Sequence, residues 1–347
     1  MNRGMCGERA TNNVDEWVQV EACPVCGADS DSLQPFERVS HDNDATLTYS
    51  ICAGCGTAFQ SPRMSDEALA AYYAGEYRRQ VQGEEGPTLK DVHVQGERAR
   101  NLAHFLTKHL DHLTIHLDIG ASTGAFLAET SKRFGCRAIG VEPGVAYRQY
   151  AASKGLEIYS DIENLPKEIR GRVDLVSLIH VLEHLPNPIA YLRRLRETWM
   201  SEHGWLLLEV PNLFGHMSFE LSHLVAFSRD SLLRALWMAG FSSEAVLIHG
   251  RPRSRFLKLY IGVLARPGDR APRSFPAAVD VRKARRRRRS ANRIRRWSTR
   301  LVPWLVWRPL PPSTAVSELA IAEQPLAHQR ADANSLGETT QHEEPCS

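Results

Sequence analysis

From residue 115 onward the chain alternates short apolar runs with amphipathic stretches, and this rhythm constrains the fold more than any other feature. The apolar runs have the length of buried strands, and the stretches between them have helical periodicity. Strands that alternate with helices indicate a parallel sheet covered by helices on both faces, so we predict an α/β, doubly wound, mostly parallel sheet. The predicted strands are 115–120, 137–142, 157–159, 173–179, 205–210, 244–249 and 256–265, and the predicted helices are 88–113, 124–134, 144–154, 188–201 and 229–239. A further helix is predicted before this region, over 62–80, with Ser65 or Asp66 as its cap.

A glycine-containing loop follows the first predicted strand of this sheet and opens a helix. Gly120 permits a tight turn out of the strand, and Gly124 permits close approach of a ligand to the start of the helix. Glu142 ends the next strand, 18 residues beyond Gly124, where a carboxylate can accept both hydroxyls of a ribose. The loop alone is weak evidence, but its position between strand and helix predicts a Rossmann-like site for a nucleoside-containing cofactor.

Five segments, in order along residues 105–265, carry a family resemblance. Residues 118–124 (DIGASTG) and 140–143 (GVEP) resemble the first two motifs of class I S-adenosylmethionine (SAM)-dependent methyltransferases. The resemblance continues through 174–188 (DLVSLIHVLEHLPNP), 206–212 (LLLEVPN) and 223–241. With the cysteine pairs described below, the chain resembles bacterial methyltransferases that have an N-terminal zinc-binding segment, among them sugar C-methyltransferases and ubiquinone-pathway-like O-methyltransferases.

The resemblance implies SAM as cofactor and a role for each motif residue. Asp118 and Gly120 would lie near the methionine part of SAM, Glu142 would hold the ribose, and Asp161 would lie near the adenine. Many relatives have glycine where this chain has Ser122, which puts affinity for the cofactor, not its identity, in question. A nicotinamide cofactor is the alternative, and the motifs after the later strands favour SAM over it.

Residues 180–184 (HVLEH) have two interpretations. The spacing matches the His-x-x-Glu-His pattern of inverted zinc peptidases, but Pro186 and Pro188 interrupt the helix that such a site needs. In a doubly wound sheet this segment would instead border the ligand crevice, so His184 and His180 are candidate general bases for methyl transfer. Two further candidates follow: His223 as a base, and Asn212 as a substrate contact or a turn residue.

Two Cys-x-x-Cys pairs, Cys23 with Cys26 and Cys52 with Cys55, precede the alternating region. Four thiolates at this spacing predict a closed, structural zinc site with one ion per chain, and the glycine after each pair suits a positive φ. Free thiol pairs and an iron–sulfur cluster are the alternatives. The total of seven cysteines is odd, which argues against a disulfide framework.

A strongly basic segment lies near the C-terminus. Residues 282–300 hold eleven Lys or Arg and no acid, which leaves the rest of the chain at −8 although the net charge is +3. Tryptophan and leucine follow the basic run as far as residue 307, so the segment suits an anionic membrane surface, nucleic acid, or a solvated charge run without a partner.

These features predict five segments: a disordered N-terminus (1–20), a zinc module (21–60), a helical connector (61–113), a methyltransferase domain (114–267), and a basic, largely disordered tail (268–347). The chain lacks an apolar signal and any apolar run of spanning length, so we expect a cytoplasmic protein without a transmembrane segment. The predicted function is SAM-dependent methyl transfer to a small-molecule acceptor, such as a nucleotide sugar or glycan precursor. The alternatives are an RNA methyltransferase and a non-catalytic zinc-ribbon binding protein with a degenerate methyltransferase fold.

Overall fold

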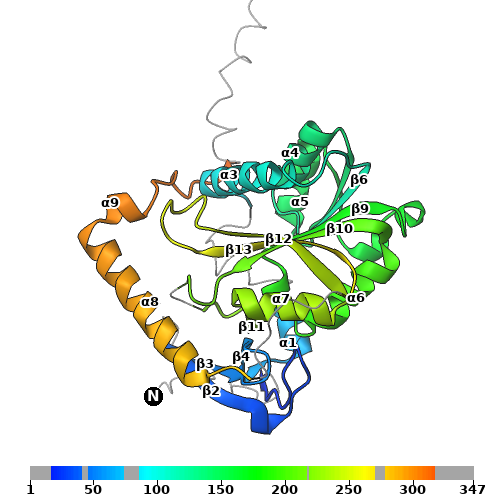
Figure 1. Cartoon of the computed structure of the whole chain (residues 1–347). Helices are drawn as coiled ribbons and strands as arrows, with labels where there is room; N and C mark the ends of the chain where they lie inside the picture. The colour runs from blue at the N-terminus through cyan, green and yellow to red at the C-terminus, as the bar shows by residue number, and fades with distance from the viewer. Residues whose placement is uncertain (1–16, 41–45, 74–85, 217–218, 270–277, 317–347) are drawn as a thin grey trace, which may run out of the picture.

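The computed structural model describes residues 17–40, 46–73, 86–216, 219–269 and 278–316 (Figure 1). Its centre is a seven-stranded sheet in the order β12-β13-β10-β9-β6-β7-β8. The five strands from β10 to β8 run parallel, and β13 and β12 extend the sheet antiparallel. The strands are β6 (Ile115–Ile119), β7 (Arg137–Val141), β8 (Glu157–Tyr159), β9 (Val173–Ile179), β10 (Met200–Pro211), β12 (Phe241–His249) and β13 (Tyr260–Pro267). The predicted mostly parallel α/β sheet is confirmed.

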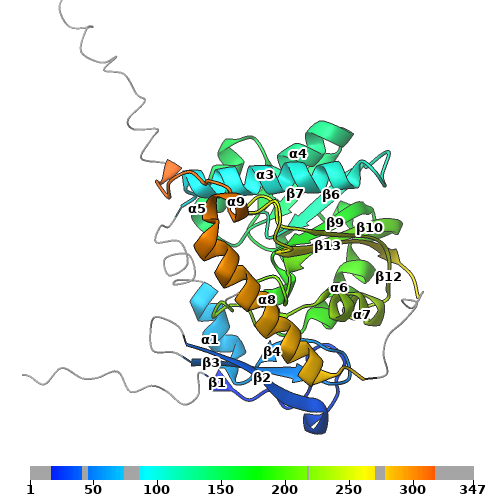
Figure 2. The same cartoon turned by 60° about the vertical axis from the view of Figure 1, so that its left-hand side comes forward.

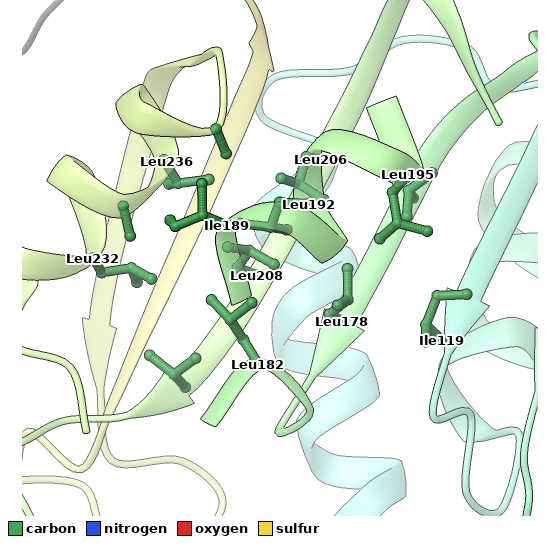
Figure 3. Packing of buried hydrophobic residues seen from close by; sticks show 14 of the residues in the cluster. Ile119, Leu178, Leu182, Ile189, Leu192, Leu195, Leu206, Leu208, Leu232 and Leu236 are labelled. Carbon is green, nitrogen blue, oxygen red and sulfur yellow. The ribbon is translucent and has the colours of Figure 1, made fainter. Parts of the chain in front are cut away.

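Helices cover both faces of the sheet, as its alternating sequence predicts. One face packs against α3 (Leu89–Leu106) and α4 (Ala125–Phe134), and the other against α6 (Pro188–Thr198) and α7 (Arg229–Met238). Strand β10 shows why both faces are buried: Leu206 and Leu208 belong to the cluster under α6 and α7, and Leu207 belongs to the cluster under α3. Figure 3 shows the first of these clusters from close by. Helix α5 (Val145–Ser153) follows β7.

A smaller four-stranded antiparallel sheet, in the order β11-β4-β3-β2, lies beside the carboxyl edge of the large one (Figures 1 and 2). Its strands β2 (Leu33–Ser40), β3 (Thr46–Cys52) and β4 (Ala58–Gln60) come from the predicted zinc module, but β11 (Val225–Ala226) comes from the methyltransferase segment. Backbone hydrogen bonds within the small sheet therefore join the two segments of the chain, and a single apolar cluster includes Phe59 and Val225 together with the centre of the large sheet.

Two short elements lead from the small sheet toward α3. Strand β5 (Arg63–Met64) pairs with β1 (Trp17–Val18), and α1 (Asp66–Ala71) follows. The Ser65 side chain accepts a hydrogen bond from the Ala68 amide, as the sequence suggested for the start of this helix. The predicted helix 62–80 continues into residues 74–85, which lie outside the described residues.

The basic segment differs from the prediction of a largely disordered tail. Residues Val281–Leu301 form helix α8, and Pro303–Val306 form the short α9. Asp280 caps α8 by accepting a hydrogen bond from the Lys283 amide. Two arginines of the run, Arg288 and Arg295, are buried against the body of the protein, where Arg288 pairs with Glu37 and donates to main-chain carbonyls. At Arg288 carboxylate and carbonyl oxygens compensate the buried charge, so this part of the arginine run packs on the protein and is not solvated.

The disorder predicted for the chain ends falls on residues 1–16 and 317–347, which lie outside the described residues. Among the residues that are described, no helix combines the length and apolar character needed to cross a bilayer.

Candidate active site

The glycine loop between β6 and α4 turns sharply and touches the segment that follows β9. Gly120 has φ +74° and Gly124 has φ +73°, and the amide of Gly120 donates to the carbonyl of Val141. A Cβ on Gly120 would lie 2.5 Å from Cγ2 of Val181, so the loop backbone packs directly on the HVLEH segment. A Cβ on Gly124 would meet the side chain of Leu156. Glycine at 124 is thus required by protein packing as well as by its left-handed backbone.

Glu142 lies directly after β7 and holds this loop in place. Its carboxylate accepts hydrogen bonds from the amides of Ser122 and Gly144, each at 2.8 Å, and the residue is only 3% exposed. Ser122 has φ +51°, a left-handed conformation in which glycine would be unstrained, at the position where many relatives have glycine. The structure therefore brings Gly120, Ser122 and Glu142 together at the carboxyl ends of two neighbouring strands.

Asp118 lies inside the sheet below this loop. Its Oδ1 accepts a hydrogen bond of 2.6 Å from the Ser177 hydroxyl, which in turn lies 2.7 Å from Nε2 of His116. Burial raises the pKa of Asp118 to about 7, with a further contribution from the charge of Glu142. Burial lowers the pKa of His116 to about 3, so this imidazole is neutral, and its Nδ1 lies 2.8 Å from the Thr130 hydroxyl.

Asp161, predicted to lie near the adenine, is exposed and follows β8. Its Oδ1 accepts a hydrogen bond from the Glu163 amide and caps a short 3-10 helix at Ile162–Asn164. The cap explains why an acidic residue is favourable at this position. Contact with a cofactor remains a prediction for this residue.

His180 and His184, grouped together by sequence, point to different partners. His180 has φ +57°, and its ring lies between two carboxylates, with Nε2 3.1 Å from Glu209 and Nδ1 3.3 Å from Glu183. Burial and the nearby Arg98 lower the pKa of His180, but the two carboxylates outweigh them and raise it above its ordinary value. His180 is therefore held in an ion-paired network at the end of β9.

His184 lies in a second group, which three separate segments build. Its Nδ1 is 2.9 Å from the carbonyl of Ser222 and 2.8 Å from the hydroxyl of Tyr73, and its ring packs edge-on against His223. Because a carbonyl can only accept, Nδ1 carries the proton and Nε2 presents its lone pair. Burial and His223 lower the pKa of His184 to about 4, so the ring is neutral at pH 7.

Glu183 is the buried member of this group. It is 1% exposed, and apart from the 3.3 Å ion pair with Nδ1 of His180 its carboxylate has no hydrogen-bond partner within the described part of the chain. The nearby histidines, led by His180, outweigh the effect of burial and lower its pKa to about 2. The ligand atoms of Glu183, His184 and His223 lie within 4.8 Å of one another, so these side chains could hold a cation or relay a proton. His180 is not part of the group, which removes the geometry of an inverted zinc peptidase.

Comparison with known proteins agrees with this arrangement. Residues 91–246 match the model of a methyltransferase domain family. The chain contains a SAM-dependent methyltransferase domain. The match supports a SAM-dependent methyltransferase over the nicotinamide-dependent alternative. No curated protein matches the chain.

Solved structures also resemble this methyltransferase. A SAM-dependent methyltransferase from Aquifex aeolicus is 16% identical, covers 51% of this chain and 93% of its own, and has a TM-score of 0.41. The 1,6-didemethyltoxoflavin-N1-methyltransferase of Burkholderia thailandensis, solved with 1,6-didemethyltoxoflavin and S-adenosylhomocysteine, is 18% identical. It covers 67% of this chain and 100% of its own, with a TM-score of 0.49.

The four paired cysteines of the methyltransferase come together as predicted. The sulfurs of Cys23 and Cys55 lie 3.5 Å apart, as do those of Cys26 and Cys52. Four thiolates at about 2.3 Å from a zinc ion would place their sulfurs about 3.8 Å apart, so the donor set fits a tetrahedral ion. Glycines 27 and 56, which follow the two pairs, have φ +71° and +75°, as expected. None of the four forms a disulfide.

Sequence reasoning missed two residues that contact His184. Tyr73 and Ser222 gave no signal because each contacts His184 only through the tertiary fold. Asn212 was left open between substrate contact and turn. In the structure its Oδ1 accepts from the Phe214 amide and its Nδ2 donates to the Lys258 carbonyl, so it forms a turn.

Proposed function

We propose that this methyltransferase transfers the methyl group of SAM to a small-molecule acceptor, with a nucleotide sugar or glycan precursor as the favoured class. The observation that carries the proposal is the contact between Gly120 and Val181. It places the predicted SAM-binding loop beside the segment that supplies His184. Methyl transfer from a sulfonium needs in-line alignment and removal of a proton, and a cofactor loop that packs on the segment carrying a neutral histidine supports both tasks.

Each predicted site residue has a part in this proposal. Glu142 would hold the ribose while it keeps the loop amides in place, and Asp118 and Gly120 would border the methionine part. His184, neutral and oriented by the Ser222 carbonyl, would accept the proton of the acceptor at Nε2. His180 would position Glu183 and the strand end and would not itself react.

The zinc site would have a structural part. The four-cysteine set has no open position and belongs to the apolar cluster that continues into the large sheet, so a zinc ion there would stabilise the small sheet and would not meet substrate. The boundaries of the five predicted segments remain our proposal for the organisation of the chain, with helices α8 and α9 inside the last segment. A strand such as β11, which crosses between two of them, means that they pack as one unit.

The proposal is tested by labelling. The protein is incubated with methyl-labelled SAM and with the small-molecule and RNA fractions of a cell extract, kept separate. Label in the small-molecule fraction supports the proposal. Label only in RNA would contradict it and would favour the RNA methyltransferase alternative, and label in neither fraction would also count against the proposed acceptor class.

The role of His184 is tested with the acceptor so found. We expect His184→Gln to lower kcat by a factor of about 10²–10⁴, the range typical of a lost general base, while SAM affinity stays the same. His203→Gln is the matched control, because His203 is exposed on β10. If His184→Gln keeps kcat within a factor of about ten of the parent, the loss is too small for a general base. His184 would then be excluded as the proton acceptor.

A further inference from the structure

Large apolar side chains are exposed on the outer surface of α8 and α9. Ile294 is 67% exposed, Trp297 64%, Leu301 61%, Trp304 77% and Leu305 54%. The first three are spaced by three and four residues, so they lie on one face of α8. Isolated exposed apolar residues need no explanation, but five within twelve positions form a patch. We call these five residues the apolar patch.

The orientation of α8 is set by its other face. Val281, Ala284, Arg288 and Arg295 are buried against the body of the protein. Arg287 lies over the ring of Phe214, and α9 is held by the Ser254 hydroxyl, which donates to the Val306 carbonyl. The apolar patch therefore points away from the protein core. Figures 1 and 2 both show α8 along the outside of the molecule, between the small sheet and α3.

Basic side chains flank the apolar patch. Between residues 281 and 308 there is no acidic residue, and no exposed basic residue of α8 forms an ion pair with a described carboxylate. The exposed basic residues of the helix are Arg282, Lys283, Arg286, Arg287, Arg289, Arg293, Arg296 and Arg300. A helix with one face packed, an apolar stripe and a dense positive charge is suited to the boundary between lipid headgroups and acyl chains.

We propose that the apolar patch and the flanking basic residues of α8 dock the protein on an anionic lipid surface. The tryptophans and leucines would enter the interface, and the arginines would pair with lipid phosphates. The charge on the helix excludes a spanning arrangement. RNA would use the arginines but would leave Ile294, Leu301 and Leu305 in water, so it accounts for only part of the surface.

Docking would also orient the enzyme. The buried Arg288 donates to the carbonyls of Leu213 and His216, in the segment that follows β10. Helix α8 thus lies over the carboxyl edge of the large sheet, the edge at which His184 is located. An enzyme docked through α8 would turn this edge toward the membrane. The inference stands on α8 and α9 alone, so its failure would leave the proposed methyl transfer untouched.

The test is flotation of the full-length protein with vesicles of phosphatidylcholine, with and without phosphatidylglycerol. We expect binding only to the anionic vesicles. Replacing Trp297 and Trp304 together by alanine should lower partitioning by at least about tenfold, since each indole would bury on the order of 100 Å² in the interface. Replacing Arg293 and Arg300 by glutamine should lower it by about 25-fold, at about fivefold for each charge.

Trp237→Ala is the matched control, because Trp237 is a partly exposed tryptophan on α7, away from the patch. Thermal unfolding of each variant shows whether it folds. Absence of binding to anionic vesicles overturns the proposal, and so does binding that the tryptophan variant leaves unchanged. Tighter binding to RNA than to vesicles would assign the surface to nucleic acid. A dimer in lipid-free solution that Trp297→Ala and Trp304→Ala dissociate would assign it to a second copy of the chain.

Discussion

The contact between the glycine loop and the HVLEH segment can be tested by adding one methyl group. A Cβ on Gly120 would lie 2.5 Å from Cγ2 of Val181, well inside van der Waals contact, and φ at this position is +74°. Gly135 offers a matched control: its φ is +65°, but nothing lies within 4 Å of a Cβ built on it. Gly120→Ala and Gly135→Ala therefore share the backbone strain and differ in the collision.

The magnitude follows from these two contributions. A left-handed conformation costs an alanine about 1–2 kcal/mol, and both variants would lose this amount of folding free energy. Overpacking against Val181 would cost Gly120→Ala about 1–3 kcal/mol more. The collision would also displace the loop that is proposed to hold SAM, so Gly120→Ala should lose SAM binding and Gly135→Ala should keep it.

Urea unfolding and calorimetric titration with SAM measure the two effects. Val181→Ala in the background of Gly120→Ala removes the colliding methyl group and should recover about 1–3 kcal/mol, which a double-mutant cycle isolates as a coupling energy. If Gly120→Ala costs no more stability than Gly135→Ala, or if Val181→Ala recovers none of the loss, the packing of this loop on the HVLEH segment is refuted.

Three further predictions concern the cysteines and the cofactor loop. Elemental analysis should find one zinc per chain, and Cys52→Ser should lose it. Cys136→Ser is the control and should keep the zinc, because Cys136 is a buried cysteine outside the cluster. A second metal equivalent would instead implicate Glu183 with His184 and His223. Ser122→Gly should stabilise the fold by about 0.5–1 kcal/mol, because glycine relieves a left-handed backbone at some entropic cost; a loss of stability in urea unfolding would contradict this. Asp118 has a folded pKa of about 7 and an unfolded pKa of about 4, so the native state binds its proton more tightly and stability falls as pH rises through this interval. The parent should therefore lose unfolding free energy between about pH 4 and 7 that Asp118→Asn does not lose. If the difference in unfolding free energy between the two proteins is constant over this range, the raised pKa is excluded.

The large sheet could be predicted because its signal is local. Each strand buried on both faces reads as a continuous apolar run, and β10, with Leu206 and Leu208 on one face and Leu207 on the other, is an example. The cysteine cluster was equally accessible, because the spacing within each pair and the glycine after it are read directly from the chain. The loop from Asp118 to Gly124 was found by motif, and its contacts with Val181 and Leu156 were not, because those depend on the packing of distant segments.

The partners of the histidines and the conformation of the basic segment needed the structure. His180 and His184 are four residues apart, but a left-handed backbone at His180 turns its ring toward Glu209, while His184 faces Ser222. The sequence pattern does not predict a left-handed backbone at a residue other than glycine. In α8 the pairing of Arg288 with Glu37 crosses most of the chain length, so the sequence predicted a largely disordered tail where a helix packs on the protein.

Strand β11 makes the two halves of this protein depend on each other. Its residues Val225 and Ala226 pair with Phe59 and Ala58, and the carbonyl of Leu224 accepts from the Gln60 amide. Cutting the polypeptide near residue 60 would leave the first piece with an open strand edge and would strip an apolar surface on the second, and both invite aggregation. The half that holds the cysteine cluster is thus not an appendage that can be exchanged between homologous enzymes; a chimera would have to carry β11 and its flanking turns along with it.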